Sequence, residues 1–398
     1  MNIKTALTAT WAAFHTFQYG FAISAMNGIQ AVVMCPSAGV PTPTRGLAPC
    51  VPMTASQFGL VVSVFTIGGL VGSLASRSVV AGRGQRGTLR ASALAILLGS
   101  SALALANNIL LMVLARIVVG LGCGLATTTV PLVLADVAPP GSKKALGIAN
   151  QLFIVLGILA AQTLSFPFGK MVVWRFVPAT AAAVALAQLL GSLLVRLPGD
   201  YPASNRMGEA EPLICEDPPL LGRETPLTIS ELLSSYDPEV TRGCSAKAIA
   251  LAIVILKVPI TISPAFLIER VGTRPLLLLP TSIMVGAMFA LASGLNSGGG
   301  TLSVAGMVAF VAAFSVGLGP VTWVVLGEVM PTRARPATSA VGLAVNWSTN
   351  FVVGAAFLPL QQRLGDSSHP GNIFYLFSGA CVAAVVAIQW GYHVYEAR

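Results

Sequence analysis

Long runs of apolar residues, separated by short polar segments, make up most of this chain. Most runs are close to 20 residues long, the length that an α-helix needs to cross the hydrocarbon core of a bilayer. Unbroken apolar runs of this length predict membrane-spanning helices rather than strands. About eleven such helices are expected, over Ala6–Val33, Phe58–Ser76, Ala91–Val113, Ile117–Ala135, Ile148–Phe168, Phe176–Val195, Ala248–Ile268, Leu276–Ser293, Leu302–Leu326, Ala337–Leu360 and Ile373–Trp390.

The composition excludes the two commonest classes of water-soluble chain. Of 398 residues, 55% are hydrophobic and 9% are charged, whereas ordinary globular domains carry about 25% charged residues. Disordered chains are poor in apolar residues, so they are excluded as well. The first run is too long for the apolar core of a signal peptide and has no clear cleavage site, so it is expected to be retained. We therefore expect an all-α polytopic membrane protein whose surroundings are the lipid bilayer.

The net charge of +9 comes from basic residues in short loops between the apolar runs. This placement is the positive-inside pattern of membrane proteins and does not indicate a nucleic-acid partner. The arginines that follow the second run and the lysines Lys143 and Lys144 predict cytosolic loops, and they place the N-terminus in the cytosol too. The segment after the sixth run is then also cytosolic. It contains all the acidic residues except Asp136, Glu269, Glu328, Asp366 and Glu396.

These patterns divide the chain into an N-terminal six-helix bundle (1–196), an acidic linker (197–245) and an incomplete C-terminal bundle of about five spans (246–398). If the linker is cytosolic, the span Ala248–Ile268 should end on the opposite side of the membrane. The arginines that follow this span nevertheless also indicate a cytosolic position. The positive-inside rule is violated, or Ala248–Ile268 is re-entrant, or one span is missing between Pro198 and Ser245. We favour a missing seventh helix of a six-plus-six design, because that segment has no apolar run long enough to cross.

Charged turns recur at corresponding places in the two halves. The turn Gly82–Gly87 carries Arg83 and Arg86, and the turn Glu269–Arg274 carries Glu269, Arg270 and Arg274. Span four is flanked by Arg116 and by Asp136 with Lys143, and the corresponding run of the second half ends at Glu328, Arg333 and Arg335. Carboxylates that face arginines can form charge-assisted pairs that hold one conformation closed. The simpler alternative is that these cations only fix the orientation of the helices in the membrane. Two such halves predict alternating access by rocking bundles.

No enzymatic or metal-binding pattern is present. The histidines His15, His369 and His393 have no Cys, Asp or Ser partners at ligand or triad spacing, so no catalytic site, metal or cofactor is expected. Cys35 and Cys50 flank a polar, proline-rich loop, and they could pair if that loop is extracytoplasmic. The sequence leaves this pairing open.

Several segments resemble the sugar porter (glucose transporter) family of the major facilitator superfamily, above all its fungal hexose-transporter-like members. The matching stretches are Gly20–Gln30, Arg116–Gly124 with Pro131–Pro140, Gly147–Gln162, Gly319–Glu328 and Asn346–Phe351. The resemblance implies two helical bundles around a central cavity. It also implies a sugar site that includes Gln151, Gln162, Trp323, Asn346 and Asn350. Amide groups that both donate and accept hydrogen bonds suit sugar hydroxyls, and an aromatic ring suits the C–H face of a sugar. Interhelical hydrogen bonding is the alternative role for the amides.

The chain also departs from the family pattern. The Gln-Gln cluster of the family's seventh helix is absent, and Lys257 occupies a position where the family usually has an asparagine. The resemblance implies a carrier for a hexose-like sugar. Proton-driven members of the family use a carboxylate in the first helix, and span one here contains no acid, so we expect a facilitative uniporter. A non-transporting or truncated relative is the alternative. The protein is expected in the plasma membrane, the vacuole or another endomembrane.

Overall fold

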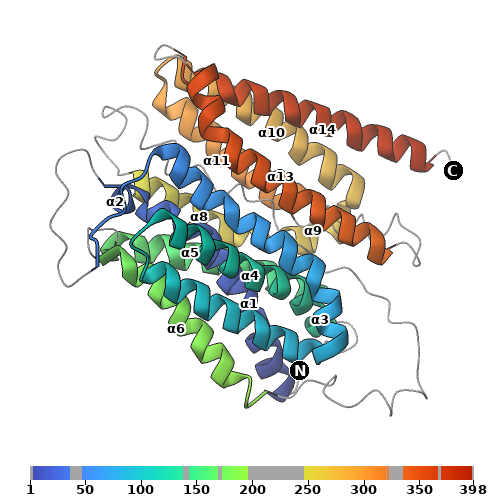
Figure 1. The fold of residues 1–398 in the computed structure, drawn as a ribbon. Coiled ribbons are helices and arrows are strands. Elements are labelled where there is room, and N and C mark those ends of the chain that lie inside the picture. Colours follow the sequence, from blue (N-terminus) through green and yellow to red (C-terminus); the bar gives the residue numbers. More distant parts are fainter. Residues whose placement is uncertain are drawn as a thin grey trace.

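The computed structural model describes residues 3–35, 47–137, 143–168, 173–195, 246–319, 321, 335–365 and 369–396. These residues are almost entirely helical, which confirms the predicted all-α membrane fold. The helices form two groups, one from each half of the chain. They lie one above the other in Figure 1, with the C-terminal group at the top.

The N-terminal half begins with the long helix α1 (Ile3–Ser24), which the short elements η1 (Asn27–Ile29) and α2 (Gln30–Val33) extend. It continues through α3 (Ala55–Ala104), α4 (Ile109–Val137), α5 (Lys143–Phe168), η2 (Val173–Arg175) and α6 (Phe176–Gly191). Helix α3 packs along α4 and α6, while α1 packs against α4 and α5.

The C-terminal half contains α8 (Ala246–Ile262), α9 (Pro264–Val271), α10 (Thr273–Asn296), α11 (Gly300–Val316), α13 (Arg335–Leu364) and α14 (Asn372–Glu396). Helix α10 packs against α11 and α14, and α8 packs against α11. Among the described residues, six helices are long and apolar enough to cross a membrane: Ala55–Ala104, Ile109–Leu134, Asn150–Phe168, Val173–Gly191, Thr273–Asn296 and Asn372–Val394.

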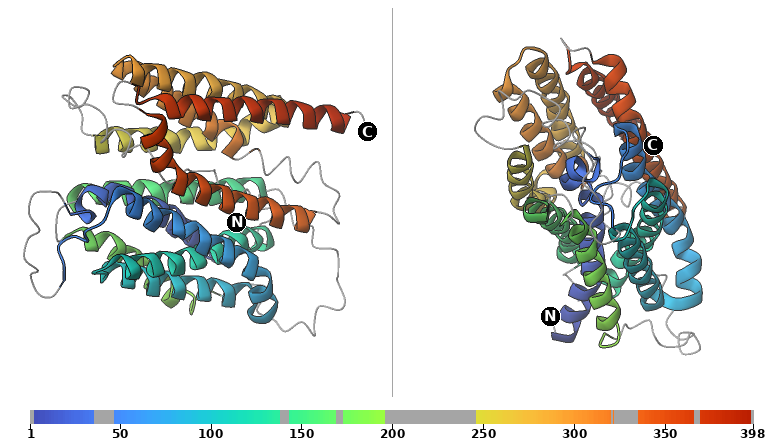
Figure 2. Two further views of the ribbon diagram at one scale, coloured as in Figure 1. Left: turned by 45° about the horizontal axis from the view of Figure 1, so that its top comes forward. Right: turned by 60° about the vertical axis from the view of Figure 1, so that its left-hand side comes forward.

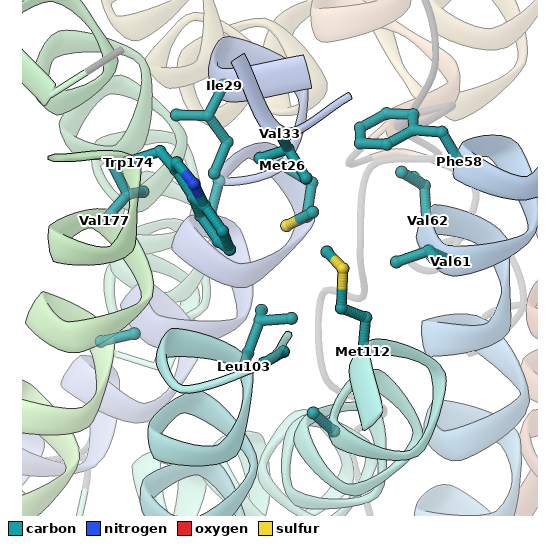
Figure 3. Packing of buried hydrophobic residues seen from close by; sticks show 14 of the residues in the cluster. Met26, Ile29, Val33, Phe58, Val61, Val62, Leu103, Met112, Trp174 and Val177 are labelled. Atoms are coloured by element: carbon teal, nitrogen blue, oxygen red, sulfur yellow. The ribbon is translucent and has the colours of Figure 1, made fainter. Parts of the chain in front are cut away.

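One end of the molecule, here called the outer end, is where α1 finishes and α3 begins. A buried core of that end joins Met26 and Ile29 to Phe58, Met112 and Trp174 (Figure 3). The Trp174 indole donates to the carbonyl of Pro49 at 2.9 Å. A disulfide joins Cys35 to Cys50 at the same end, so the pairing that the sequence left open is present. The opposite end, where α3 turns at Gly84, is here called the inner end.

The predicted break between the third and fourth spans is displaced. The sequence placed it after Val113, but α3 ends at Ala104 and α4 begins at Ile109. The polar pair Asn107 and Asn108 makes the break, and the side chain of Asn108 accepts from the backbone N–H of Leu111 at 2.8 Å. Such a cap satisfies a backbone donor at a helix start. The prediction was wrong because the flanking residues are equally apolar, so hydropathy alone does not show the boundary.

The two charged turns have the same backbone conformation, which confirms that they are tight glycine turns. Gly84 has φ 67° and ψ 174°, and Gly272 has φ 81° and ψ 171°. Only glycine adopts this region without strain. Each turn is also in contact with the last helical segment of its own half. Arg90 donates to the hydroxyl of Ser192 just after α6 at 2.9 Å, and Arg274 lies over the ring of Tyr392 in α14.

The residues on either side of 196–245 lie at opposite ends of the molecule. Val195 packs in one cluster with Trp11 and Val130 at the inner end. Ile253 of α8 packs with Leu291 and Ile373, and α8 lies toward the α2 end of the molecule while α9 lies toward the other end (Figure 1). Arg270 and Arg274 therefore come at the inner end with the other cationic turn. The acidic linker and the proposed missing span lie outside the described residues.

Candidate functional site

The two halves of the molecule meet through two pairs of helices. Helix α13 packs on α3, and α8 packs on α5. In the left view of Figure 2, α13 runs along the boundary between the two groups of helices. Helix α13 joins both halves, because its outer part carries Phe357, which packs with Phe374 of α14 and Ile253 of α8. Residues on these four helices are the candidates for a site between the halves.

Trp347 of α13 is the most deeply embedded side chain of this interface. Its indole N–H donates to the hydroxyl of Ser73 in α3 at 2.9 Å. Its ring lies against Gly69, where an added Cβ would come within 2.5 Å of the ring atoms. Tyr19 and Phe65 meet it edge-on, with ring centroids 5.8 Å and 6.1 Å away. Trp347 therefore docks the second half onto the first near the middle of both helices.

The small residues of α3 and α4 permit this arrangement. Close helix packing is found at Gly68, Gly69, Gly72, Gly120, Gly122 and Gly124. A Cβ at Gly68 or Gly72 would clash with the backbone of α4, and one at Gly120 or Gly124 would clash with the backbone of α3. Gly69 differs from the other five glycines because the side chain that packs against it is Trp347 of the opposite half.

Gln151 lies on α5, the first-half helix of the second contact between the halves. It is buried on α5, three residues before Ile154. Ile154 and Ile158 form one cluster with Val254 of α8 and Trp347 of α13. Helix α8 runs from the outer to the inner end, and α5 runs the opposite way. With a helical rise of 1.5 Å per residue, Lys257 therefore lies at about the level of residues Gln151–Val155 of α5. Lys257 is also buried, on the same face of α8 as Val254.

The structure describes three more of the residues predicted for sugar binding. Asn350 is buried on α13 and its amide donates to Asn346 at 3.4 Å, while Asn346 is partly exposed. The two asparagines flank Trp347 along α13. Gln162 lies two turns beyond Ile154 on α5, and its buried side-chain oxygen has no hydrogen-bond partner among the described residues. Trp323 lies outside the described residues.

Arg116 is placed differently from the sequence expectation. It does not open α4 but lies inside it, fully buried. Its guanidinium donates to the carbonyls of Ala22 at 2.8 Å, Val62 at 3.3 Å and Val61 at 3.4 Å, and it stacks over Phe65 at 4.5 Å. Asp136 lies at the other end of the same helix, 20 residues or about 30 Å away. The structure therefore does not bring Arg116 and Asp136 together.

The inner-end charges of the first half contact polar groups of neighbouring segments. Asp136 accepts from the amide of Gln85 at 2.6 Å. Arg86 and Arg90 both donate to the carbonyl of Ser192, which follows α6. Cations that bind the last carbonyls of a helix stabilise its C-terminus. Arg83 is exposed, as is Arg270 in the second half. Glu328 and Arg333 lie outside the described residues, as do the side chains of Lys143, Glu269 and Arg335.

Sequence reasoning did not assign Trp347, Tyr19, Phe65 or Ser73 to the site. One signal was available, because Trp347 is flanked by Asn346 and Asn350 in an otherwise apolar run. Its hydrogen-bond partner, Ser73, lies 274 positions away along the chain. No local pattern predicts that contact.

Comparison with known proteins gives a consistent result. The family model described as "Sugar (and other) transporter" matches residues 8–210 and 240–395. A probable metabolite transport protein of Saccharomyces cerevisiae is 26% identical, over 94% of this chain and 89% of that protein. Human facilitated glucose transporter member 3 is 25% identical, over 93% of this chain and 85% of its own length. Both relatives are transporters by name.

Solved structures show the same fold. A D-xylose–proton symporter has a TM-score of 0.76 at 19% identity, covering 98% of this chain and 97% of that one. The nucleoside transporter NupG has a TM-score of 0.67 at 13% identity, covering 98% of both chains. At these identities the likeness concerns the fold alone.

Proposed function

The chain belongs to the sugar (and other) transporter family of the major facilitator superfamily, and from this premise we propose that it carries a hexose-like sugar by facilitative uniport. The observation that carries the proposal is the interface between the halves. Buried amide side chains, Gln151 and Asn350, lie there beside an aromatic cluster. This combination suits a ligand with a ring of hydroxyls and an apolar face.

Alternating access is supported by how the two halves are joined. Each half is packed within itself by close helix pairs such as α3–α4 and α10–α11, whereas α3–α13 and α5–α8 are the pairs that connect them. Two bundles that meet through such helix pairs can rock as bodies around a site at their boundary. Arg86 and Arg90 bind the end of α6 and so fasten the inner turn within the first bundle.

Uniport is supported by the lack of acids in eight of the described helices. Helices α1, α3, α5, α6, α8, α10, α11 and α13 contain no Asp or Glu within the bounds that the structure describes. Arg116, the buried cation closest to α1, is bound by three backbone carbonyls. Proton-driven transport by a carboxylate requires an embedded acid that takes up and releases a proton. Without one, the sugar gradient alone drives the flux.

The disulfide supports an orientation. Cys35–Cys50 lies at the outer end and the cationic turns lie at the inner end. Disulfides persist in oxidising compartments, and cationic loops stay in the cytosol. Both arguments favour an outer end in the lumen or outside the cell and a cytosolic N-terminus.

Uptake by purified protein in proteoliposomes tests the proposal. Labelled glucose should equilibrate down its gradient, and a protonophore at fixed internal pH should leave the initial rate unchanged. Accumulation above equilibrium that collapses with the protonophore would exclude uniport. No uptake of any of several hexoses would favour the alternative of a non-transporting relative.

A further inference from the structure

Lys257 is a buried cation at the boundary between the halves. Its exposed fraction is 7%, and it occupies the middle of α8 between Val254 and Thr261, which are buried on the same face. Val254 packs with Ile154, Ile158, Tyr19 and Trp347. An ammonium group in this position is expensive to remove from water, and ionisable groups within spans usually mark a pathway or a ligand.

The neighbours of Lys257 at this level belong to the proposed sugar site. The antiparallel arrangement of α5 and α8 brings Lys257 to the level of Gln151. Trp347 of α13 belongs to the same cluster as Val254, and Asn346 and Asn350 flank Trp347 along α13. A neutral sugar requires donors and acceptors, which the amides supply. It does not require a full positive charge, and an asparagine would serve it without the cost of burying an ion.

We infer that Lys257 selects sugars that carry one carboxylate, such as uronic or aldonic acids, over neutral sugars. The inference rests on the proposed function and narrows its substrate class. Lys257 already has an interaction within the protein in this conformation, and the solute carboxylate takes over the ammonium as the halves part. The amides of α5 and α13 then bind the hydroxyls.

A single ammonium matches a monoanion better than a phosphate ester. A phosphomonoester carries about 1.5 to 2 negative charges at neutral pH, whereas a sugar acid carries one. Lysine acts as a point charge with three donors, so it can bind one carboxylate without the bidentate fork of arginine. Sugar phosphates are therefore expected to bind no more tightly than neutral sugars.

Binding to the purified full-length protein tests the inference with D-glucose, D-glucuronate and glucose 6-phosphate as probes. A charge-assisted hydrogen bond should make glucuronate bind about tenfold to a hundredfold tighter than glucose. Lys257→Asn should abolish this preference while glucose binding persists. Arg363→Gln, which removes an exposed cation from the outer part of α13, is the matched control and should leave the preference unchanged.

The outcomes separate the inference from the proposed function. If wild-type protein binds glucose as tightly as glucuronate, or if Lys257→Asn keeps the preference, the inference is wrong while sugar transport stands. If the wild type binds neither probe, the proposed function fails and the inference fails with it. Should Lys257→Asn not accumulate, Lys257→Gln takes its place, and a Lys257→Gln protein that keeps the preference for glucuronate overturns the inference.

Discussion

Replacing Gly69 with alanine should weaken the docking of the C-terminal half onto the N-terminal half. The added Cβ would lie 2.5 Å from two ring atoms of Trp347 and 2.7 Å from a third. Carbon atoms pack best about 3.5 to 4.0 Å apart, so the indole has to move by about 1 Å. It has little room, because Tyr19 and Phe65 flank the ring and the N–H is held by Ser73.

The size of the effect follows from three terms. Overpacking of a filled site costs about 1 to 3 kcal/mol, and an interhelical hydrogen bond in a membrane protein is worth about 0.6 kcal/mol on average. Against this, alanine is better than glycine within a helix by about 1 kcal/mol. We therefore expect a net loss of about 1 to 2 kcal/mol for Gly69→Ala.

The assay is thermal unfolding of the purified protein in detergent, compared with Gly82→Ala. Gly82 lies in the same helix α3 but has no atom within 4 Å of an added Cβ, so that variant keeps the helix gain without the clash. A double-mutant cycle of Ser73→Ala with Trp347→Phe isolates the hydrogen bond, with an expected coupling of about 0.6 kcal/mol. A Gly69→Ala protein as stable as Gly82→Ala would refute the reasoning, and strictly additive effects in the cycle would exclude the hydrogen bond.

Three further predictions concern other parts of the molecule. Gln151→Ala should lower solute affinity about fivefold, the loss of one hydrogen bond of about 1 kcal/mol, with normal expression; unchanged affinity, or a protein that fails to accumulate, would indicate a structural glutamine. Reduction of Cys35–Cys50, which closes a separation of 15 residues, should destabilise the protein by about 3 kcal/mol, and reductant should have no effect on the Cys35→Ser/Cys50→Ser protein. Gly84→Ala should lose about 1 to 2 kcal/mol because φ is 67° there, whereas Gly82→Ala should not; equal unfolding midpoints would contradict this explanation.

The sequence alone determined the class of protein and much of its architecture. Apolar runs of bilayer length can satisfy their backbone polar groups in lipid only as helices, so the all-α fold followed directly from hydropathy. The glycines of the turns at Gly84 and Gly272 were also predictable, because a positive φ at a cationic turn depends on local chemistry. The same holds for the glycines between α3 and α4, whose spacing of small residues indicates close helix packing.

The tertiary structure decided how these elements act on one another. Hydropathy misplaced the start of α4, because the Asn107–Asn108 break lies between equally apolar segments, and Arg116 was consequently taken for a helix end. The partners of Arg116 are carbonyls of α1 and α3, and those of Arg86 and Arg90 lie just after α6. Such contacts depend on which helices pack together. The docking of Trp347 on Gly69 and Ser73 is the clearest case, because it joins two halves that are separate in the sequence and meet only when the chain folds.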